Sequence, residues 1–215
     1  RRRRVPLLSP YLCYFSSPKR SKRLGSVDRG PIVYLHGFCS SPASLKSRLL
    51  GEYMAGRGLA DRFICPQLSP VPDEAVADVS RLIEVAGGPV TLVGSSLGGH
   101  YANHLAEKYG LNAVLINPAA VRYLDPALFI GDHVNFHSGE RFTFTVAHAV
   151  QLAAQVSPPT SGRYWLLSEM GDEVLDWRQA ADFYAGSRQT VLPGGDHSFT
   201  RFAEFMPQIL EYAGL

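Results

Sequence analysis

The sequence predicts an α/β fold with a mainly parallel central sheet and helices on both of its faces. From residue 31 onward, short apolar runs alternate with segments of helical periodicity, and this order is typical of parallel strands joined by right-handed crossovers. The strand-like runs are apolar throughout, as expected where both faces of a sheet are covered. Residues 94–98 add a sharp turn motif between one strand and its helix.

The expected elements follow one another in strict order. Apolar runs predict strands at 31–37, 62–68, 89–93, 113–117, 163–168 and 190–192. Helical spacing predicts helices at 41–57, 73–85, 97–109, 146–156, 178–185 and 199–212. The first of these helices is expected to open with Ser41 as its N-cap and Pro42 in its first turn.

The alternation lapses for about 45 residues, a length at which loops usually cover an active site. We therefore expect a small cap at about 119–161, or alternatively an element packed at the edge of the sheet. With 215 residues and 46% hydrophobic content, the chain can form one domain over 30–215. It has no apolar stretch near twenty residues, so no membrane partner is expected.

The charge of the chain is concentrated at its beginning. Residues 1–30 hold nine of the 21 Lys and Arg residues and a single acid, Asp28, whereas the remainder holds 12 basic and 18 acidic residues. We interpret 1–29 as a basic extension, disordered or non-native, and not as a nucleic-acid arm, a membrane tether or a targeting peptide. No nucleic-acid partner is expected, and the oligomeric state is left open.

The three cysteines, Cys13, Cys39 and Cys65, are scattered. They lack the paired spacing of a zinc or redox site and the density of a disulfide framework. A reducing cytoplasm is the simpler inference.

Gly94-Ser95-Ser96-Leu97-Gly98 matches the G-x-S-x-G nucleophile elbow of α/β hydrolases. A serine at such a turn has a strained backbone, so the flanking positions need residues without side chains. Only Ser96 has glycine at both required positions, because Ser95 would place Val93 and Leu97 there. Ser96 is therefore the candidate nucleophile, with a glycine-rich turn and an ordinary serine cap as the alternative.

A serine hydroxyl needs a base, and in this class the acid and then the histidine follow the nucleophile along the chain. His197 is the candidate base, because it alone lies in a glycine-rich loop after a late strand. Asp172 is the candidate acid, with Glu173 and Asp176 as rivals. Asn117 cannot serve as an acid, and we expect Asp196 to be solvated.

An oxyanion also needs donors aimed at it in advance. The backbone N–H groups of Leu97 and Phe38 are the candidates, the first directly after the nucleophile and the second in the loop after the first strand. His36 is expected to orient that loop by hydrogen bonds rather than to act as the base. The candidate residues of the substrate pocket are His36, Gly37, Cys39 and Ser95.

Neither a metal nor a cofactor is expected. His100 and His104 have the spacing of a metal pair, but the residues between them lack the glutamate of zinc peptidases. The polar residues of the cap are expected to be solvated: Asp132, His133, His137 and Glu140.

Together these motifs resemble the small bacterial YqiA-type esterases of the α/β-hydrolase superfamily, over residues 31 to about 213. The resemblance is carried by Tyr34-Leu35-His36-Gly37-Phe38, Ser40-Ser41-Pro42, Gly94-Ser95-Ser96-Leu97-Gly98-Gly99, Asn117-Pro118, Gly171-Asp172-Glu173-Val174-Leu175-Asp176 and Gly194-Gly195-Asp196-His197-Ser198-Phe199. It implies an α/β-hydrolase fold and a cytoplasmic hydrolase of short acyl esters, with Ser96, Asp172 and His197 at the triad positions.

The sequence thus predicts a serine esterase that cleaves small-molecule, short-chain carboxylic esters through an acyl-enzyme. An acyl thioesterase with the same triad is the alternative within enzymes. A non-catalytic binding protein that retains the hydrolase fold is the alternative outside them.

Overall fold

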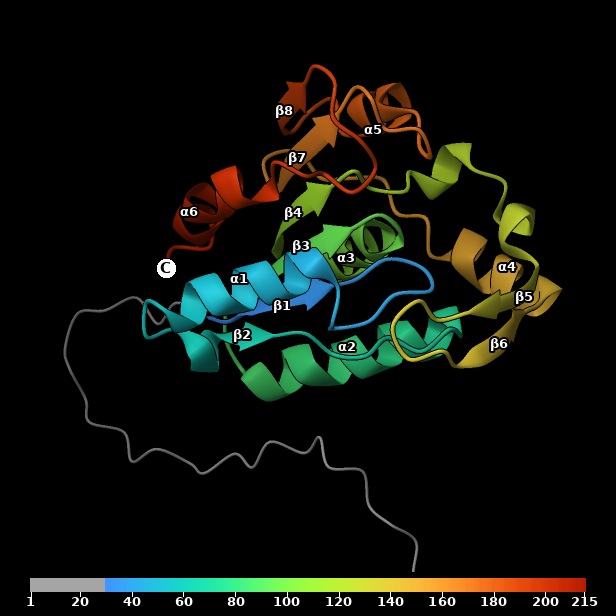
Figure 1. The fold of residues 1–215 in the computed structure, drawn as a ribbon, viewed down its shortest axis with the longest axis horizontal. Coiled ribbons are helices and arrows are strands. Elements are labelled where there is room, and N and C mark those ends of the chain that lie inside the picture. Colours follow the sequence, from blue (N-terminus) through green and yellow to red (C-terminus); the bar gives the residue numbers. More distant parts are fainter. Residues whose placement is uncertain (1–29) are drawn as a thin grey trace, which may run out of the picture.

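The computed structural model describes residues 30–215, and the predictions made for 1–29 lie outside the described residues. Figure 1 shows a twisted central sheet of six strands, all parallel, in the order β2-β1-β3-β4-β7-β8. The strands are β1 (Ile32–Leu35), β2 (Phe63–Ile64), β3 (Thr91–Ser95), β4 (Asn112–Ile116), β7 (Tyr164–Glu169) and β8 (Arg188–Leu192). The predicted α/β fold with a parallel sheet is confirmed.

Six α-helices accompany this sheet in the described part of the chain. They are α1 (Leu45–Ala55), α2 (Pro72–Ala86), α3 (Leu97–Tyr109), α4 (Val146–Ala154), α5 (Trp177–Phe183) and α6 (Phe202–Tyr212). Three short 3₁₀ helices lie between them, η1 (Ala60–Arg62), η2 (Val121–Tyr123) and η3 (Pro126–Phe129). Residues 119–161 contain η2, η3, α4 and an antiparallel hairpin of β5 (Gly131–Val134) and β6 (Arg141–Phe144).

The helices cover both faces of the sheet, because successive side chains of each strand point to opposite faces. On one face, Val114 and Trp165 belong to the core that α1 and α6 cover with Leu50 and Ile209. On the other face, the core is covered by α2, α3, α4 and α5 and includes Val33, Leu35, Leu92, Leu115 and Leu166. The three strands β3, β4 and β7, which are adjacent in the middle of the sheet, are therefore buried on both faces.

The first helix begins later than the sequence predicts. It starts at Leu45 with Ser44 as its N-cap, and not at Ser41. Ser41 instead closes a separate turn, in which its hydroxyl accepts from Ala43 N–H at 3.0 Å and its carbonyl accepts from Ser44 N–H at 3.0 Å. A serine before proline fits this local turn as well as a helix cap, so the prediction was wrong by one turn.

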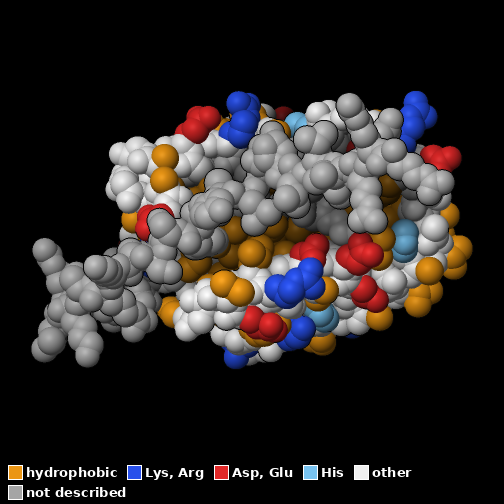
Figure 2. All heavy atoms as spheres, turned by 90° about the horizontal axis from the view of Figure 1, so that it is seen from below, with side chains coloured by type: hydrophobic (Ala, Val, Ile, Leu, Met, Phe, Trp, Pro, Cys, Tyr) orange, Lys and Arg blue, Asp and Glu red, His pale blue; other side chains and the backbone are white. Residues whose placement is uncertain are grey.

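Within residues 30–215, no helix is long and apolar enough to cross a bilayer. α2 is amphipathic. It lies at the bottom of the molecule in Figure 1, on the side that Figure 2 shows from below. Its exposed face carries Asp73, Glu74, Arg81 and Glu84, whereas Val76, Val79 and Ile83 face the core. In Figure 2 charged side chains gather near the middle of the visible surface, and apolar side chains lie in patches beside them.

Two of the three valines of α2, Val79 and Val85, provide a matched test of the packing. Val79→Ala is expected to lower the free energy of unfolding by about 2 kcal/mol, because Val79 is 0% exposed and its methyl groups leave a cavity. Val85→Ala, at a site 81% exposed, is expected to change it by less than about 0.5 kcal/mol. Urea unfolding measures both, and equal effects would contradict the described orientation of α2.

Candidate active site

Ser96 occupies the sharp turn between β3 and α3. Its backbone has φ 54° and ψ −124°, a strained conformation for a residue with a side chain. A Cβ atom on Gly94 would lie 2.3 Å from the carbonyl oxygen of Gly98, and one on Gly98 would lie 2.0 Å from that of Leu35. Both positions therefore exclude any side chain, as the choice of register around Ser96 requires.

The structure brings Ser96, His197 and Asp172 together from three different loops. His197 Nε2 lies 3.1 Å from Ser96 Oγ. His197 Nδ1 lies 2.9 Å from Asp172 Oδ2 and 3.0 Å from Oδ1. The contacts from Ser96 to Asp172 form one continuous chain of hydrogen bonds, in which a proton on Nδ1 leaves Nε2 free to accept from the serine.

Asp172 is held as a carboxylate by its surroundings. Its side chain is 2% exposed, and its Oδ1 accepts from the backbone N–H groups of Val174 at 2.9 Å and Leu175 at 2.8 Å. Burial alone would raise the pKa of Asp172, but the hydrogen bonds from His197 and these two amides hold the pKa below its usual value. A charged Asp172 fixes the orientation of the imidazole.

The rival acids have other contacts. Glu173 accepts from the backbone N–H of His197 at 3.0 Å, and not from its ring. Asp176 caps α5 by accepting from Arg178 N–H at 3.0 Å. The expectation that Asp196 is solvated was wrong for one of its oxygens: the residue is half-buried, and its Oδ1 is buried without a hydrogen-bond partner among the described residues. The backbone N–H of Asp196 donates to the buried Glu169 at 2.8 Å.

The two residues that carry the candidate oxyanion donors, Phe38 and Leu97, line the same cavity as Ser96. Leu97 is the first residue of α3, where the N–H group has no acceptor within the helix. Phe38 lies in the loop after β1, next to Gly37, whose Cβ position is 3.2 Å from Ser96 Cβ and 3.6 Å from Ser96 Oγ. The loop thus lies directly against the candidate nucleophile.

The cavity that contains Ser96 and His197 has a volume of about 590 Å³. Residues from the cap segment form its apolar wall, Leu124, Leu128, Phe129 and Phe136, together with Ala119, Val174 and Leu175. Two of the predicted pocket residues, Gly37 and Ser95, also line it. Leu128 and Phe136 are 77% and 80% exposed, so the entrance of the cavity is apolar as well.

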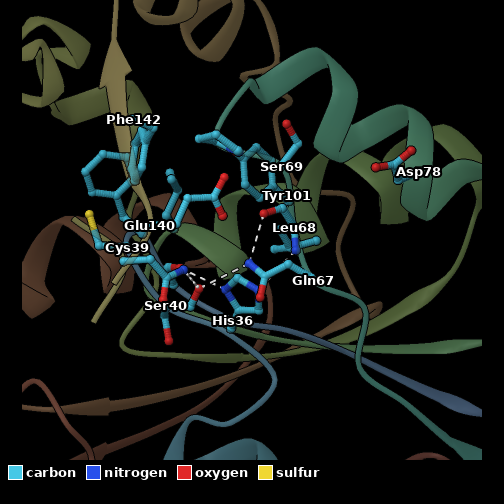
Figure 3. A pocket seen from close by; sticks show the side chains of 15 residues that line it. His36, Cys39, Ser40, Gln67, Leu68, Ser69, Asp78, Tyr101, Glu140 and Phe142 are labelled. Atoms are coloured by element: carbon cyan, nitrogen blue, oxygen red, sulfur yellow. Dashed lines mark hydrogen bonds between the residues drawn. The ribbon is translucent and has the colours of Figure 1, made fainter. Parts of the chain in front are cut away.

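The other two predicted pocket residues, His36 and Cys39, line a smaller neighbouring cavity of about 210 Å³ instead (Figure 3). This is a correction: the His36 ring accepts from Leu68 N–H, and both Leu68 and Cys39 line that neighbouring cavity and not the one that contains Ser96. In Figure 3 the amide of Gln67 closes one side by donating to the carbonyls of Ser40 at 3.3 Å and Leu68 at 3.2 Å. Glu140 and Tyr101 form another side.

His36 fixes the loop after β1, as expected of a structural histidine. Its Nδ1 lies 3.0 Å from the carbonyl oxygen of Gly37, and its Nε2 accepts from Leu68 N–H at 3.1 Å. Burial lowers the pKa of His36 to about 4, so the ring is neutral at physiological pH. It joins the loop of Phe38 to the segment after β2.

A buried network that the sequence does not reveal holds the loop of His197. Glu169, fully buried at the end of β7, accepts from Asp196 N–H at 2.8 Å and from Arg201 Nε at 2.7 Å. Asn117, at the end of β4, donates to the carbonyls of Asp196 at 3.0 Å and His197 at 3.2 Å, and accepts from Glu169 N–H. The only available signal was that both polar residues end apolar strands.

The ring of Phe38 was not expected to have a role of its own. It packs edge-on against His133, Phe129, Phe142 and Phe144 of the cap segment, with ring centroids 4.7–5.6 Å apart. Asn135 adds a hydrogen bond of 2.7 Å to the carbonyl of Ser40. The expectation that His133 is solvated was therefore wrong, because its ring is part of this aromatic cluster.

The two histidines of α3 differ in their contacts: His104 is hydrogen-bonded within the protein, whereas His100 is buried and its Nε2 has no hydrogen-bond partner among the described residues. His104 Nδ1 lies 3.0 Å from the carbonyl of Gln155 and 3.3 Å from Ser157 Oγ, and burial lowers the pKa of His100 to about 3. In the described range 30–215, no group of three or more His, Cys, Asp or Glu side chains is arranged to hold a metal ion.

The parallel sheet, the elbow at Ser96 and the loops that end at Asp172 and His197 define the α/β-hydrolase fold. The chain belongs to the family described as "Uncharacterised protein family (UPF0227)", which matches residues 31–214. This match and the fold confirm the resemblance to YqiA-type α/β hydrolases inferred from the motifs.

Solved structures of distant sequence share the fold. A protein from Agrobacterium vitis S4, provisionally described as a hydrolase, aligns with a TM-score of 0.68 at 19% identity, covering 86% of this chain and 88% of its own. Mouse alpha/beta hydrolase domain-containing protein 10 aligns at 0.64 and 21% identity, covering 88% and 91%. A monoacylglycerol lipase from Paleococcus ferrophilus aligns at 0.62 and 17% identity, covering 88% and 95%.

Removing the charge of Glu169 tests the buried network. Glu169→Gln is expected to lower the free energy of unfolding by about 1–3 kcal/mol, because Arg201 loses its buried partner. Asp78→Asn is the control, since its partner Arg81 is 68% exposed and such surface pairs contribute about 0–1 kcal/mol. Urea unfolding measures both variants, and an unaffected Glu169→Gln protein would show that the network does not stabilise the loop.

Because His36 is buried and neutral, the free energy of unfolding is expected to depend on pH. The unfolded chain binds a proton near the ordinary pKa of 6.5, but the folded protein resists protonation until about pH 4. Stability is therefore complete above pH 6.5 and decreases as the pH falls toward 4, by about 2 kcal/mol from this residue between pH 7 and pH 5. His36→Gln is expected to flatten the dependence, measured by urea unfolding at both pH values. An unchanged slope would contradict this origin.

Proposed function

We propose that this protein is a serine hydrolase that cleaves short-chain carboxylic esters of small molecules through an acyl-enzyme intermediate. The observation that carries the proposal is the hydrogen-bond chain from Ser96 Oγ through His197 to Asp172, with lengths of 3.1 and 2.9 Å. No step of the proposed mechanism requires a cofactor or a metal.

The first half of the reaction forms the acyl-enzyme. Ser96 Oγ attacks the ester carbonyl carbon and passes its proton to His197 Nε2, while Asp172 stabilises the resulting imidazolium. The carbonyl oxygen becomes an oxyanion that accepts hydrogen bonds from the N–H groups of Phe38 and Leu97. The intermediate then breaks its bond to the alcohol oxygen, which takes the proton from Nε2 and departs.

The second half repeats these roles with water. His197 Nε2 removes a proton from a water molecule, whose oxygen attacks the acyl carbon, and the same two amides bind the new oxyanion. Its collapse breaks the bond to Ser96 Oγ, which regains a proton from His197. The carboxylic acid is released, and the enzyme returns to its starting state.

The substrate class rests on the shape and lining of the cavity. Its apolar walls suit a hydrocarbon acyl group, and the similar Paleococcus structure is a monoacylglycerol lipase, which supports an ester as the substrate. We place the protein in the cytoplasm because Cys39 and Cys65 are both free thiols, as is usual in a reducing compartment.

Ser96→Ala tests the nucleophile directly. It is expected to lower kcat for p-nitrophenyl acetate by at least about 10³-fold, because no other group can form the acyl-enzyme. A fluorophosphonate probe is expected to label the unaltered protein, with mass mapping placing the label on Ser96. The variant should keep its urea unfolding midpoint.

Ser95→Ala is the matched control, since the neighbouring serine should remain dispensable for labelling. Retained turnover in Ser96→Ala, or a label on another residue, would contradict the triad. Absence of both labelling and turnover would favour a binding protein with the hydrolase fold. Faster turnover of acetyl-CoA than of p-nitrophenyl acetate would favour a thioesterase.

A further inference from the structure

We propose that Lys46 forms an anion-binding corner of the catalytic cavity, so that the preferred ester carries a carboxylate or phosphate group on its alcohol portion. This inference rests on the proposed hydrolase function and adds the chemical class of the substrate. Lys46 lies in the first turn of α1 and lines the cavity together with Ser96 and His197.

No other Lys, Arg, Asp or Glu side chain lines this cavity among the described residues. The lining groups other than Lys46 and His197 are apolar, hydroxyl-bearing or backbone groups. The carboxylates of Asp172, Asp196 and Glu169 act on Lys46 from outside the lining. Within residues 30–215, no carboxylate oxygen lies within 4.0 Å of Lys46 Nζ.

The ammonium group of Lys46 is only partly satisfied by the protein. It donates one hydrogen bond, of 2.6 Å, to the carbonyl oxygen of Ser198, although an ammonium group carries three donors. Burial lowers the pKa of Lys46, and the three nearby carboxylates only partly offset this effect. A cation removed from water gains most from a partner of opposite charge.

Ser44 provides a second, independent indication. It is the N-cap of α1, yet its hydroxyl forms no capping bond, and its Oγ is buried with no partner among the described residues. Ser44 lines the same cavity as Lys46. A rotation of the Ser44 side chain toward the cavity would let this hydroxyl donate to an anion, and the N-terminus of α1 beside it favours negative charge.

The bond to Ser198 indicates which part of the substrate lies there. Ser198 directly follows His197, whose Nε2 must reach the leaving oxygen of the alcohol to protonate it. Lys46 is therefore on the side of the cavity that the alcohol portion occupies. The apolar wall from the cap segment is left for the acyl group.

Two pairs of butyryl esters test this inference. One compares 1-butyrylglycerol 3-phosphate with 1-butyrylglycerol, and the other compares O-butyryl lactate with O-butyryl lactamide. In each pair the measured quantity is the ratio of kcat/KM for the charged ester to kcat/KM for the neutral one. We expect a ratio of about 10–100 in at least one pair, since a hydrogen bond to a charged group has that effect. The pair with the larger ratio shows whether the cavity prefers a phosphate or a carboxylate group on the alcohol portion.

Lys46→Met keeps the apolar stem and removes the charge, so the ratio is expected to fall to about one, whereas Lys46→Arg retains it. Lys108→Met is the matched control, because Lys108 is exposed in the last turn of α3 and its variant should keep the original ratio. If Lys46→Met does not fold, inhibition of the unaltered protein is the second measurement. Glycerol 3-phosphate should then inhibit 1-butyrylglycerol hydrolysis at least about tenfold more strongly than glycerol.

Ratios near or below one in both pairs would overturn the inference while neutral ester turnover and probe labelling remain. An equal loss for charged and neutral esters in Lys46→Met would also overturn it, because Lys46 would then act only by holding Ser198. Loss of labelling and of all turnover in the unaltered protein would instead overturn the proposed hydrolase function, and this inference with it.

Discussion

The close approach of α3 to the end of β1 is the constraint on which the site depends. The backbone at Gly98 lies so near the carbonyl of Leu35 that a Cβ atom would be only 2.0 Å from it. This contact lets the turn at Ser96 keep its strained φ of 54°, because the packed strand and helix on either side determine the turn completely. It also places the loop of Gly37 and Phe38 against the serine, so the same packing arranges the proposed nucleophile and the proposed oxyanion donors.

The histidine loop is positioned by a different kind of interaction. Glu169 is fully buried, and burial of a carboxylate costs free energy unless donors surround it. The amide of Asp196 and the guanidinium of Arg201 are these donors, and Asn117 joins the same loop to the end of β4. Such a network has a narrow range of acceptable geometries, which gives the His197 loop one position relative to β4 and β7.

The sequence predicts the sheet, its parallel strands and the positions of Ser96, His197 and Asp172, because apolar periodicity, glycine spacing and chain order are local signals. The roles of Glu169 and of the Phe38 ring were not predictable in this way. In the sequence Glu169 is one charged residue at the end of a strand. Its role in holding the His197 loop follows only from its hydrogen bonds to Asp196 and Arg201, which are 27 and 32 positions away in the chain. The start of α1 was misjudged because a Ser-Pro step suits both a turn and a helix cap.

The cap segment connects the proposed substrate cavity to the loop that carries the proposed oxyanion donor Phe38. Its side chains form the apolar wall of the cavity, and its aromatic residues also enclose the ring of Phe38, whose backbone N–H is a proposed oxyanion donor. Asn135 and Phe136 bond the backbone of residues 39 and 40, so the hairpin of β5 and β6 and the loop after β1 form one packed unit. A change in the cap therefore alters the cavity and the geometry of the oxyanion donors together, while the contacts of Ser96, His197 and Asp172 come from other elements.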